Sequence, residues 1–205
     1  MLTTTLIIDD FFQDPVEIRN SFLKMDYPDS KGTANYPGRD SSQRLDLPGI
    51  DELVSELTGE KVISKISPSH GHARISMASD DIDRKYTVHI DPGAVWSGII
   101  YLNLPEQCQR GTEFFRHIET GMERAPIYPH ELEAMGAKNY MDGCAKIIEN
   151  DSNDMSKWEP TMTVPMRFNR LVLLRPWYFH TSGISFGNTN ENSRLVYLLF
   201  FGGVE

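Results

Sequence analysis

Two strand-like segments that meet at a Pro-Gly turn constrain the fold of this 205-residue chain more than any other feature. The first segment ends in His89-Ile90-Asp91, and the second runs from Trp96 to Asn103. In a strand, residues two positions apart point to the same face, about 7 Å from each other. We therefore expect His89 and Asp91 to direct an imidazole and a carboxylate toward a common point.

A second histidine would complete a metal site, because two histidines and one carboxylate hold a ferrous ion and leave further positions open. The best candidate is His180, which ends an apolar run from Arg170 that reads as one core strand. Arg194 then opens another expected strand, Leu195 to Phe201. The chain order is His-x-Asp, a long gap, His, Arg.

This ordered series resembles the Fe(II)/2-oxoglutarate-dependent dioxygenases, in particular the small prolyl-hydroxylase-like members. The resemblance extends from Arg74 onward and includes Ile99 to Asn103, Gly111 to Phe114 and Val164-Pro165, each in the order of the family. A lone His-x-Asp is a weak signal, whereas the whole series is a strong one.

The resemblance implies an enzyme that binds Fe(II) and uses 2-oxoglutarate and O2. It would hydroxylate a C–H bond while 2-oxoglutarate is decarboxylated to succinate. The implied metal ligands are His89, Asp91 and His180. Arg194 would bind the distal carboxylate of 2-oxoglutarate, because a guanidinium meets a carboxylate in two parallel hydrogen bonds. The family usually has this arginine nearer to the histidine, so Arg175 and Arg170 are lesser candidates.

Several further residues are candidates for the pocket, each with an alternative structural role. The motif position of Tyr101 implies a second contact to the distal carboxylate, although a buried tyrosine with a satisfied hydroxyl would look the same in sequence. By the same resemblance, the cosubstrate pocket could include Tyr86, Asn103 and Thr112. Residues that could contact the primary substrate are Arg39, Arg74, Trp96 and Trp177.

Short strands with turn residues between them predict a mainly β (α+β) fold with a jelly-roll-like double sheet. The resemblance implies that this double sheet is the double-stranded β-helix core of the family, a jelly-roll of the cupin-like kind. We expect a single domain over 1–205. Residues 1–68 would supply a strand at Thr5 to Phe12 and two helices that buttress the sheet, the first capped by Asp14. Residues 70–205 would form the core. An insertion at about 121–158, helical over 129–148, would be a lid or a packing helix.

The acidic composition, with a net charge of -9, opposes nonspecific binding to nucleic acid or to an anionic membrane surface. No apolar run approaches membrane-spanning length, and the amino terminus does not read as a secretory signal. Cys108 and Cys144 lack metal-ligand spacing, as expected for idle thiols in a reducing cytoplasm.

We therefore expect a cytoplasmic oxygenase that acts on a small-molecule or amino-acid-like substrate. The alternatives are a hydroxylase of peptidyl side chains with the same mechanism and a β-helix protein that binds a ligand without catalysis. A zinc hydrolase is a weaker reading, because nothing beside the expected triad supplies a general base.

Overall fold

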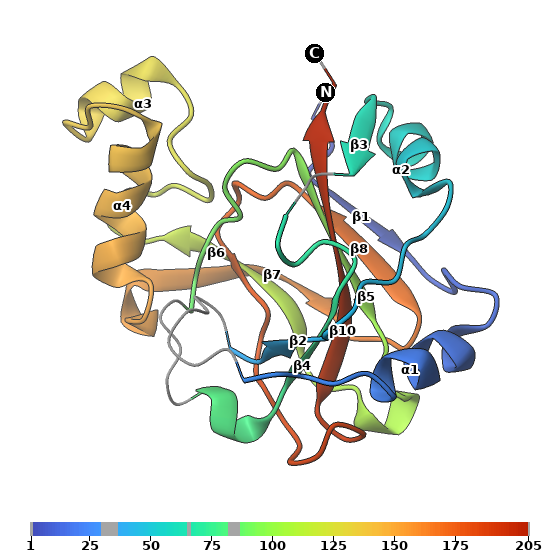
Figure 1. Ribbon diagram of the computed structural model, residues 1–205. Coiled ribbons are helices and arrows are strands. Elements are labelled where there is room, and N and C mark those ends of the chain that lie inside the picture. The colour runs from blue at the N-terminus through green and yellow to red at the C-terminus, as the bar shows by residue number, and fades with distance from the viewer. Residues whose placement is uncertain (1, 30–36, 65–66, 82–86, 205) are drawn as a thin grey trace.

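The computed structural model describes residues 2–29, 37–64, 67–81 and 87–204, and it contains two antiparallel β-sheets with several helices around them (Figure 1). The seven-stranded sheet has the order β1 (Thr5–Ile8), β8 (Arg170–Leu174), β5 (Trp96–Tyr101), β10 (Arg194–Gly203), β4 (Ala73–Ser76) and β2 (Arg39–Asp40), with β3 (Val62–Ser64) also paired to β10. The three-stranded sheet has the order β7 (Trp158–Pro165), β6 (Gly111–His117) and β9 (His180–Thr181). The fold is thus mainly β, as predicted.

Strand β10 shows how the sequence builds the layers. It pairs with both β5 and β4, so it lies inside the larger sheet. Its odd-numbered residues, such as Leu195 and Tyr197, belong to a core cluster on one face, and Val196 and Leu198 belong to a cluster on the other. The second cluster also contains Phe114 of β6, so the two sheets pack face to face. Successive residues of a strand point to opposite faces, so a run of apolar residues is typical of a strand that is covered on both sides.

Helices α1 (Pro15–Leu23) and α2 (Ile50–Thr58) cover the outer face of the larger sheet. Phe22 and Val54 are fully buried in the same cluster as Tyr197. Helix α2 ends at Gly59, whose φ of 69° is left-handed and suits a glycine C-terminal cap. Asp14 precedes α1, but its side chain makes no capping hydrogen bond, so the predicted cap is wrong.

The segment at 121–158 carries α3 (Pro129–Ala134) and α4 (Tyr140–Asp151), which lie on the side of the molecule away from α1 and α2 (Figure 1). The single helical face predicted over 129–148 is therefore two helices. Gly136, with a φ of 58°, lies between them, and Asn139 then caps α4 by accepting a hydrogen bond from the Asp142 backbone at 3.0 Å. Ile147 packs in a cluster with Trp158 of β7, so α4 covers the smaller sheet.

Three short 3₁₀ segments complete the described elements: η1 (Ala78–Asp81), η2 (Pro105–Gln107) and η3 (Met155–Lys157).

Two predicted strands differ from the structure near the expected site. The run from Arg170 to His180 is not one strand, because β8 ends at Leu174 and the chain turns before β9 begins at His180. Pro176 lies in this turn, where its missing N–H would interrupt a strand ladder. In the described part of the run that ends at Asp91, residues 87–91, the structure has an isolated bridge between His89 and His180 and no named strand. Because of the turn and the bridge, His89 and His180 lie next to each other.

Candidate metal centre

The backbones of His89 and His180 are hydrogen-bonded to each other in both directions. The His89 N–H donates to the His180 carbonyl at 2.8 Å, and the His180 N–H donates to the His89 carbonyl at 3.0 Å. The two imidazole rings therefore lie close, with their centroids 4.4 Å apart. Because β9 pairs with β6, this bridge places both rings at the edge of the smaller sheet.

Asp91 completes the cluster from the turn that follows. Its backbone N–H donates to the Pro176 carbonyl at 2.8 Å, in the turn between β8 and β9. Its carboxylate oxygens lie 4.0 Å from Nε2 of His89 and 3.5 Å from Nε2 of His180. One atom from each of these three side chains lies within 4.8 Å of the other two. The predicted triad is thus a spatial cluster, although its members are far apart in the chain.

Each histidine ring makes a hydrogen bond through Nδ1, and this bond orients Nε2 toward Asp91. Nδ1 of His89 lies 3.1 Å from the Thr87 carbonyl oxygen, and Nδ1 of His180 lies 2.7 Å from the Tyr178 carbonyl oxygen. A carbonyl only accepts, so each Nδ1 carries a proton and each Nε2 is the nitrogen left for the centre. Metal-binding histidines characteristically have this second hydrogen bond.

The electrostatics of the cluster favour an anionic carboxylate and a neutral His89. Burial and the neighbouring His180 lower the pKa of His89 to about 3, against the opposing effect of Asp91. Burial alone would raise the pKa of Asp91, but hydrogen bonds and the histidine charges outweigh it and lower the pKa to about 2. Burial would likewise lower the pKa of His180, but Asp91 outweighs it and raises the pKa. A metal ion bound at Nε2 of His180 would compete with a proton at that atom.

This donor set fits a divalent transition metal. Nitrogen and carboxylate ligands lie about 2.0–2.2 Å from such an ion, so two donors on one ion are at most about 4.4 Å apart. The separation of 4.0 Å between His89 and Oδ1 of Asp91 and that of 3.5 Å between His180 and Oδ2 each meet this condition. Two imidazoles and one carboxylate are the ligands of mononuclear iron oxygenase sites and also of some open, catalytic zinc sites, whereas closed zinc sites need a fourth protein ligand. His89, Asp91 and His180 form the one such cluster among the residues that the structure describes.

A cavity of about 320 Å³ opens at the three donors, between the two sheets. Its wall includes Ile99 of β5 and Val196 and Leu198 of β10, which are apolar, and two arginines. The arginines are Arg74 on β4 and Arg194 at the start of β10. The cavity therefore combines a metal-binding end with positive charge on its wall, within a largely apolar surface.

Arg194 is the arginine that the sequence favoured for the cosubstrate. Its side chain is 3% exposed, and its guanidinium carbon lies 6.0 Å from the centroid of the Tyr101 ring. The two lesser candidates are bound elsewhere. Arg170 donates to Asp9 at 2.6 Å, and Arg175 is ion-paired with Glu60. The structure thus brings Arg194, and neither of the others, to the wall of the metal-binding cavity.

Three predicted cosubstrate residues lie behind the cavity wall. The hydroxyls of Tyr101 and Thr112 are hydrogen-bonded to each other at 2.7 Å, and both residues are fully buried. The Asn103 amide donates to the Ser193 carbonyl at 2.7 Å and accepts from the Leu195 N–H at 2.8 Å. Asn103 therefore holds the start of β10, and it is not among the residues that line the cavity. Tyr86 lies outside the described residues.

Three of the predicted substrate contacts are placed away from the cavity. Trp96 is buried in the cluster under the helices, and its Nε1 donates to Glu60 at 3.2 Å. Trp177 packs against the cluster around α4. Arg39 donates to the Met77 sulfur at 3.5 Å. None of the three is among the residues that line the cavity.

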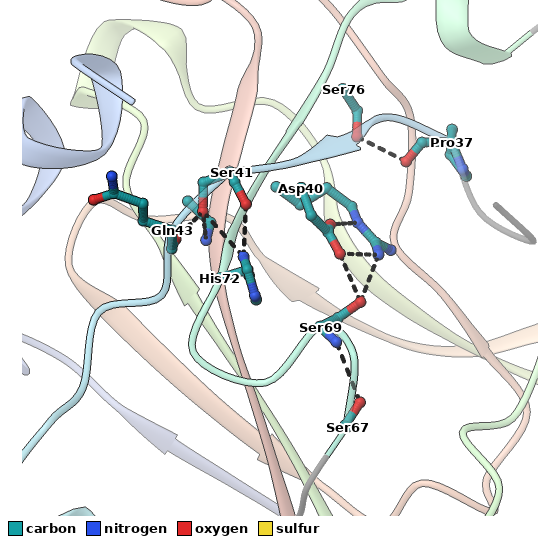
Figure 2. Close-up of polar contacts among 10 residues, drawn as sticks. Pro37, Asp40, Ser41, Gln43, Ser67, Ser69, His72 and Ser76 are labelled. Carbon is teal, nitrogen blue, oxygen red and sulfur yellow. Dashed lines mark hydrogen bonds and ion pairs between the residues drawn. The ribbon is translucent and has the colours of Figure 1, made fainter. Parts of the chain in front are cut away.

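Arg74 is the predicted substrate contact that does line the cavity. Its Nε donates to Asp40 at 2.6 Å, and its Nη2 donates to Asp40 at 3.2 Å and to Ser69 at 3.1 Å. Ser69 in turn donates to Asp40 at 2.7 Å (Figure 2). Figure 2 also shows Ser76 pointing to the carbonyl of Pro37, to which it donates at 3.2 Å. Asp40 and Ser69 thus hold the Arg74 guanidinium in one orientation.

The sequence reasoning missed Ser97, which lies in the metal centre. Its buried hydroxyl donates to Oδ2 of Asp91 at 2.8 Å. Alternation along β5 was the available signal, because Ser97 shares a face with Ile99 and Tyr101. Asp40 and Ser69 were also missed, and nothing in their local sequence separates them from ordinary loop residues.

A family model described as "Family of unknown function (DUF6445)" matches residues 2–201. The chain belongs to that family. No curated protein matches the chain.

Two solved structures of HygX from Streptomyces hygroscopicus are similar to the chain. The first, with nickel and 2-oxoglutarate bound, has a TM-score of 0.49 at 11% identity and covers 98% of this chain and 84% of HygX. The second, with nickel, 2-oxoglutarate and hygromycin B bound, has a TM-score of 0.45 at 14% identity and covers 98% and 83% of the two chains. In the chain itself, no helix of the described residues is long and apolar enough to cross a membrane.

Proposed function

We propose that this protein is an Fe(II)- and 2-oxoglutarate-dependent oxygenase that hydroxylates a C–H bond of a small-molecule or amino-acid-like substrate. The two facing sheets would then be the halves of a jelly-roll core. The observation that carries the proposal is the convergence of His89, Asp91 and His180 on one point in a cavity that Arg194 also lines.

The metal ligands and the apolar residues of the cavity would have different roles in the reaction. His89, Asp91 and His180 would hold Fe(II) through one side of its coordination shell and leave the opposite side open to the cosubstrate and O2. When bound, the iron and 2-oxoglutarate would supply the oxidising chemistry, in which 2-oxoglutarate takes up one oxygen atom of O2 and loses carbon dioxide to become succinate. The apolar side chains of Ile99 and Leu198 would keep water away from the reacting C–H bond.

Arg194 would bind the distal carboxylate of 2-oxoglutarate. A buried guanidinium meets a carboxylate with two charge-assisted hydrogen bonds, which gives both affinity and direction. Tyr101 belongs to the same proposal, because its ring lies beside Arg194 and its hydroxyl pairs with Thr112. Tyr86 remains a proposed pocket residue.

Arg74 would contact the primary substrate. It lines the cavity, Asp40 and Ser69 fix its orientation, and its charge reaches His89, where it helps to lower the pKa. A guanidinium held in one orientation favours a substrate with an anionic or strongly hydrogen-bond-accepting group. The cavity volume of about 320 Å³ suits a small molecule.

The decisive experiment measures metal binding and turnover together. Protein purified without oxygen is given Fe(II), 2-oxoglutarate and O2, and succinate is measured without a primary substrate. We expect one iron per chain and slow succinate formation, because these enzymes consume 2-oxoglutarate even when uncoupled. The variants His89→Ala and His180→Ala should lose both. A wild-type protein that binds no iron and makes no succinate would overturn the proposal.

A titration of the protein with Fe(II) and 2-oxoglutarate distinguishes the proposed oxygenase from a β-helix protein that binds a ligand without catalysis. Fe(II) bound together with 2-oxoglutarate gives a visible charge-transfer band, whereas a barrel that binds only an organic ligand gives none. A peptidyl-hydroxylase would show the band and the uncoupled succinate but would respond to peptides and not to free amino acids or other small molecules.

A further inference from the structure

Ser97 lies at the contact between the metal centre and the larger sheet. It belongs to β5, where it pairs with Leu174 of β8 on one side and Phe200 of β10 on the other. Its side chain is buried, with 2% of the residue exposed, and its hydroxyl donates to Oδ2 of Asp91 at 2.8 Å. The donor is thus fixed in the middle of a sheet, while the acceptor lies in a turn.

The turn fixes the backbone of Asp91 but not the torsions of its side chain. Its backbone is held by the hydrogen bond to Pro176, but that bond does not set the rotation of the carboxylate about the Cβ–Cγ bond. A carboxylate that is free to rotate can offer a metal one oxygen or both. A hydrogen bond to one oxygen fixes the plane of the group and the direction of its remaining lone pairs.

We propose that Ser97 is a positioning residue for the metal centre: it holds the carboxylate of Asp91 in the plane in which Oδ1 lies nearest to His89 and Oδ2 lies nearest to His180. This inference rests on the proposed function of the site. It assigns to Ser97 no contact with the metal, the cosubstrate or the substrate.

The geometry separates this role from that of an ordinary buried serine. A buried hydroxyl needs a partner, and in strands that partner is commonly a backbone carbonyl. Ser76, which lines the same cavity and is equally buried, follows that rule by donating to the Pro37 carbonyl at 3.2 Å. Ser97 donates instead to a side chain of the metal-binding cluster.

The test uses the full-length, metal-free protein and Co(II) as the probe. We expect Ser97→Ala to weaken Co(II) binding by about 10–100-fold, the effect of removing a hydrogen bond behind a metal ligand. The visible absorption of bound Co(II) should also change, because it reports the number and arrangement of ligands. Ser97→Thr keeps the hydroxyl and should restore both the affinity and the spectrum.

The matched control is Ser76→Ala, which removes a buried hydroxyl from the same cavity without touching Asp91. Its Co(II) affinity should equal that of the wild type. Thermal unfolding of each metal-free variant checks folding. If Ser97→Ala does not fold, Ser97→Val takes its place, because valine has the shape of threonine without the hydroxyl, and the same weakening is expected.

The possible failures are distinguishable. If the wild type and its Ser97 variants bind Co(II) equally and give the same spectrum, the role of Ser97 is overturned and the proposed function stands. If the wild type binds no more Co(II) than His89→Ala does, the metal site itself is wrong, and the proposed function falls with it.

Discussion

At the scale of single residues, the buried arginines differ in what their guanidinium groups contact. Arg175 stacks on Trp96, with its guanidinium carbon 4.0 Å from the ring centroid, and it donates to the Thr3 carbonyl at 3.0 Å. It therefore fastens the amino-terminal segment to the larger sheet. Arg194 instead lines the cavity of the metal centre. The sequence favoured Arg194 over Arg175 for the cosubstrate, and the contacts of the two guanidinium groups show that their surroundings differ.

Replacing Arg194 by methionine tests its proposed role. Arg194→Met keeps much of the side-chain volume and removes the charge, so 2-oxoglutarate should lose a charge-assisted contact of about 1.5–3 kcal/mol. We expect its apparent affinity, measured as the 2-oxoglutarate dependence of succinate formation, to fall by about 10–100-fold. Co(II) affinity should not change.

Arg170→Met is the matched control, because Arg170 binds Asp9 outside the cavity. It should reduce thermal stability and leave the 2-oxoglutarate dependence as in the wild type. An unchanged 2-oxoglutarate dependence in Arg194→Met would remove that residue from the cosubstrate site.

Residue chemistry explains how much of the centre could be predicted. His89, Asp91 and His180 were accessible because metal ligation demands particular residue types in a recognisable order. Ser97 could not be predicted in this way, because a hydrogen bond to a metal ligand can come from many residue types at many spacings in the sequence. The same holds for Asp40, whose contact with Arg74 depends on the pairing of β2 with β4.

At the scale of elements, α3 is a short helix that depends on side-chain contacts at its start. Glu131 accepts two hydrogen bonds from Arg124, at 2.8 and 3.0 Å, and further ones from the Ile127 and Tyr128 N–H groups, both at 3.0 Å. These bonds satisfy backbone donors that the first turn of a helix leaves unpaired. They outweigh the opposing effect of burial and lower the pKa of Glu131 to about 2.

Replacing Glu131 by glutamine should destabilise the protein in a pH-dependent way. The lowered pKa means that the carboxylate stabilises the fold fully above its ordinary pKa of 4.5, and that this contribution is lost as the pH falls toward about 2. At pH 7, Glu131→Gln should lower the free energy of unfolding by about 1–2 kcal/mol. Near pH 3.5 the difference from the wild type should shrink. Urea unfolding at the two pH values measures both, and an equal difference at both would contradict the ionic role.

Element boundaries near the site were harder to predict than the elements themselves. The apolar run from Arg170 gave β8 correctly but concealed the turn at Pro176, because buried turn residues and buried strand residues are equally apolar. That turn matters for the centre, since the Pro176 carbonyl binds the Asp91 N–H. Local pattern thus predicts which segments enter the core and not where the chain passes from one sheet to the other.

At the scale of the whole molecule, the metal centre lies across the two sheets. His180 belongs to β9 of the smaller sheet, and Asp91 is hydrogen-bonded to Ser97 of β5 in the larger one. His89 joins the cluster through its backbone pairing with His180. An ion bound to all three side chains would connect the sheets at the mouth of the cavity.

A metal that binds this site should therefore stabilise the entire fold. Because the unfolded chain does not hold the three donors together, a metal at a hundred times its Kd adds about 2.7 kcal/mol to the free energy of unfolding. For a chain of this size we expect the Tm to rise by about 5–10 °C with Mn(II) or Co(II). Hydrogen exchange should also slow at the backbone amides of His89 and His180, which bind each other's carbonyls. His89→Ala should show neither effect, and a Tm that rises equally in that variant would mean that the metal acts elsewhere on the molecule.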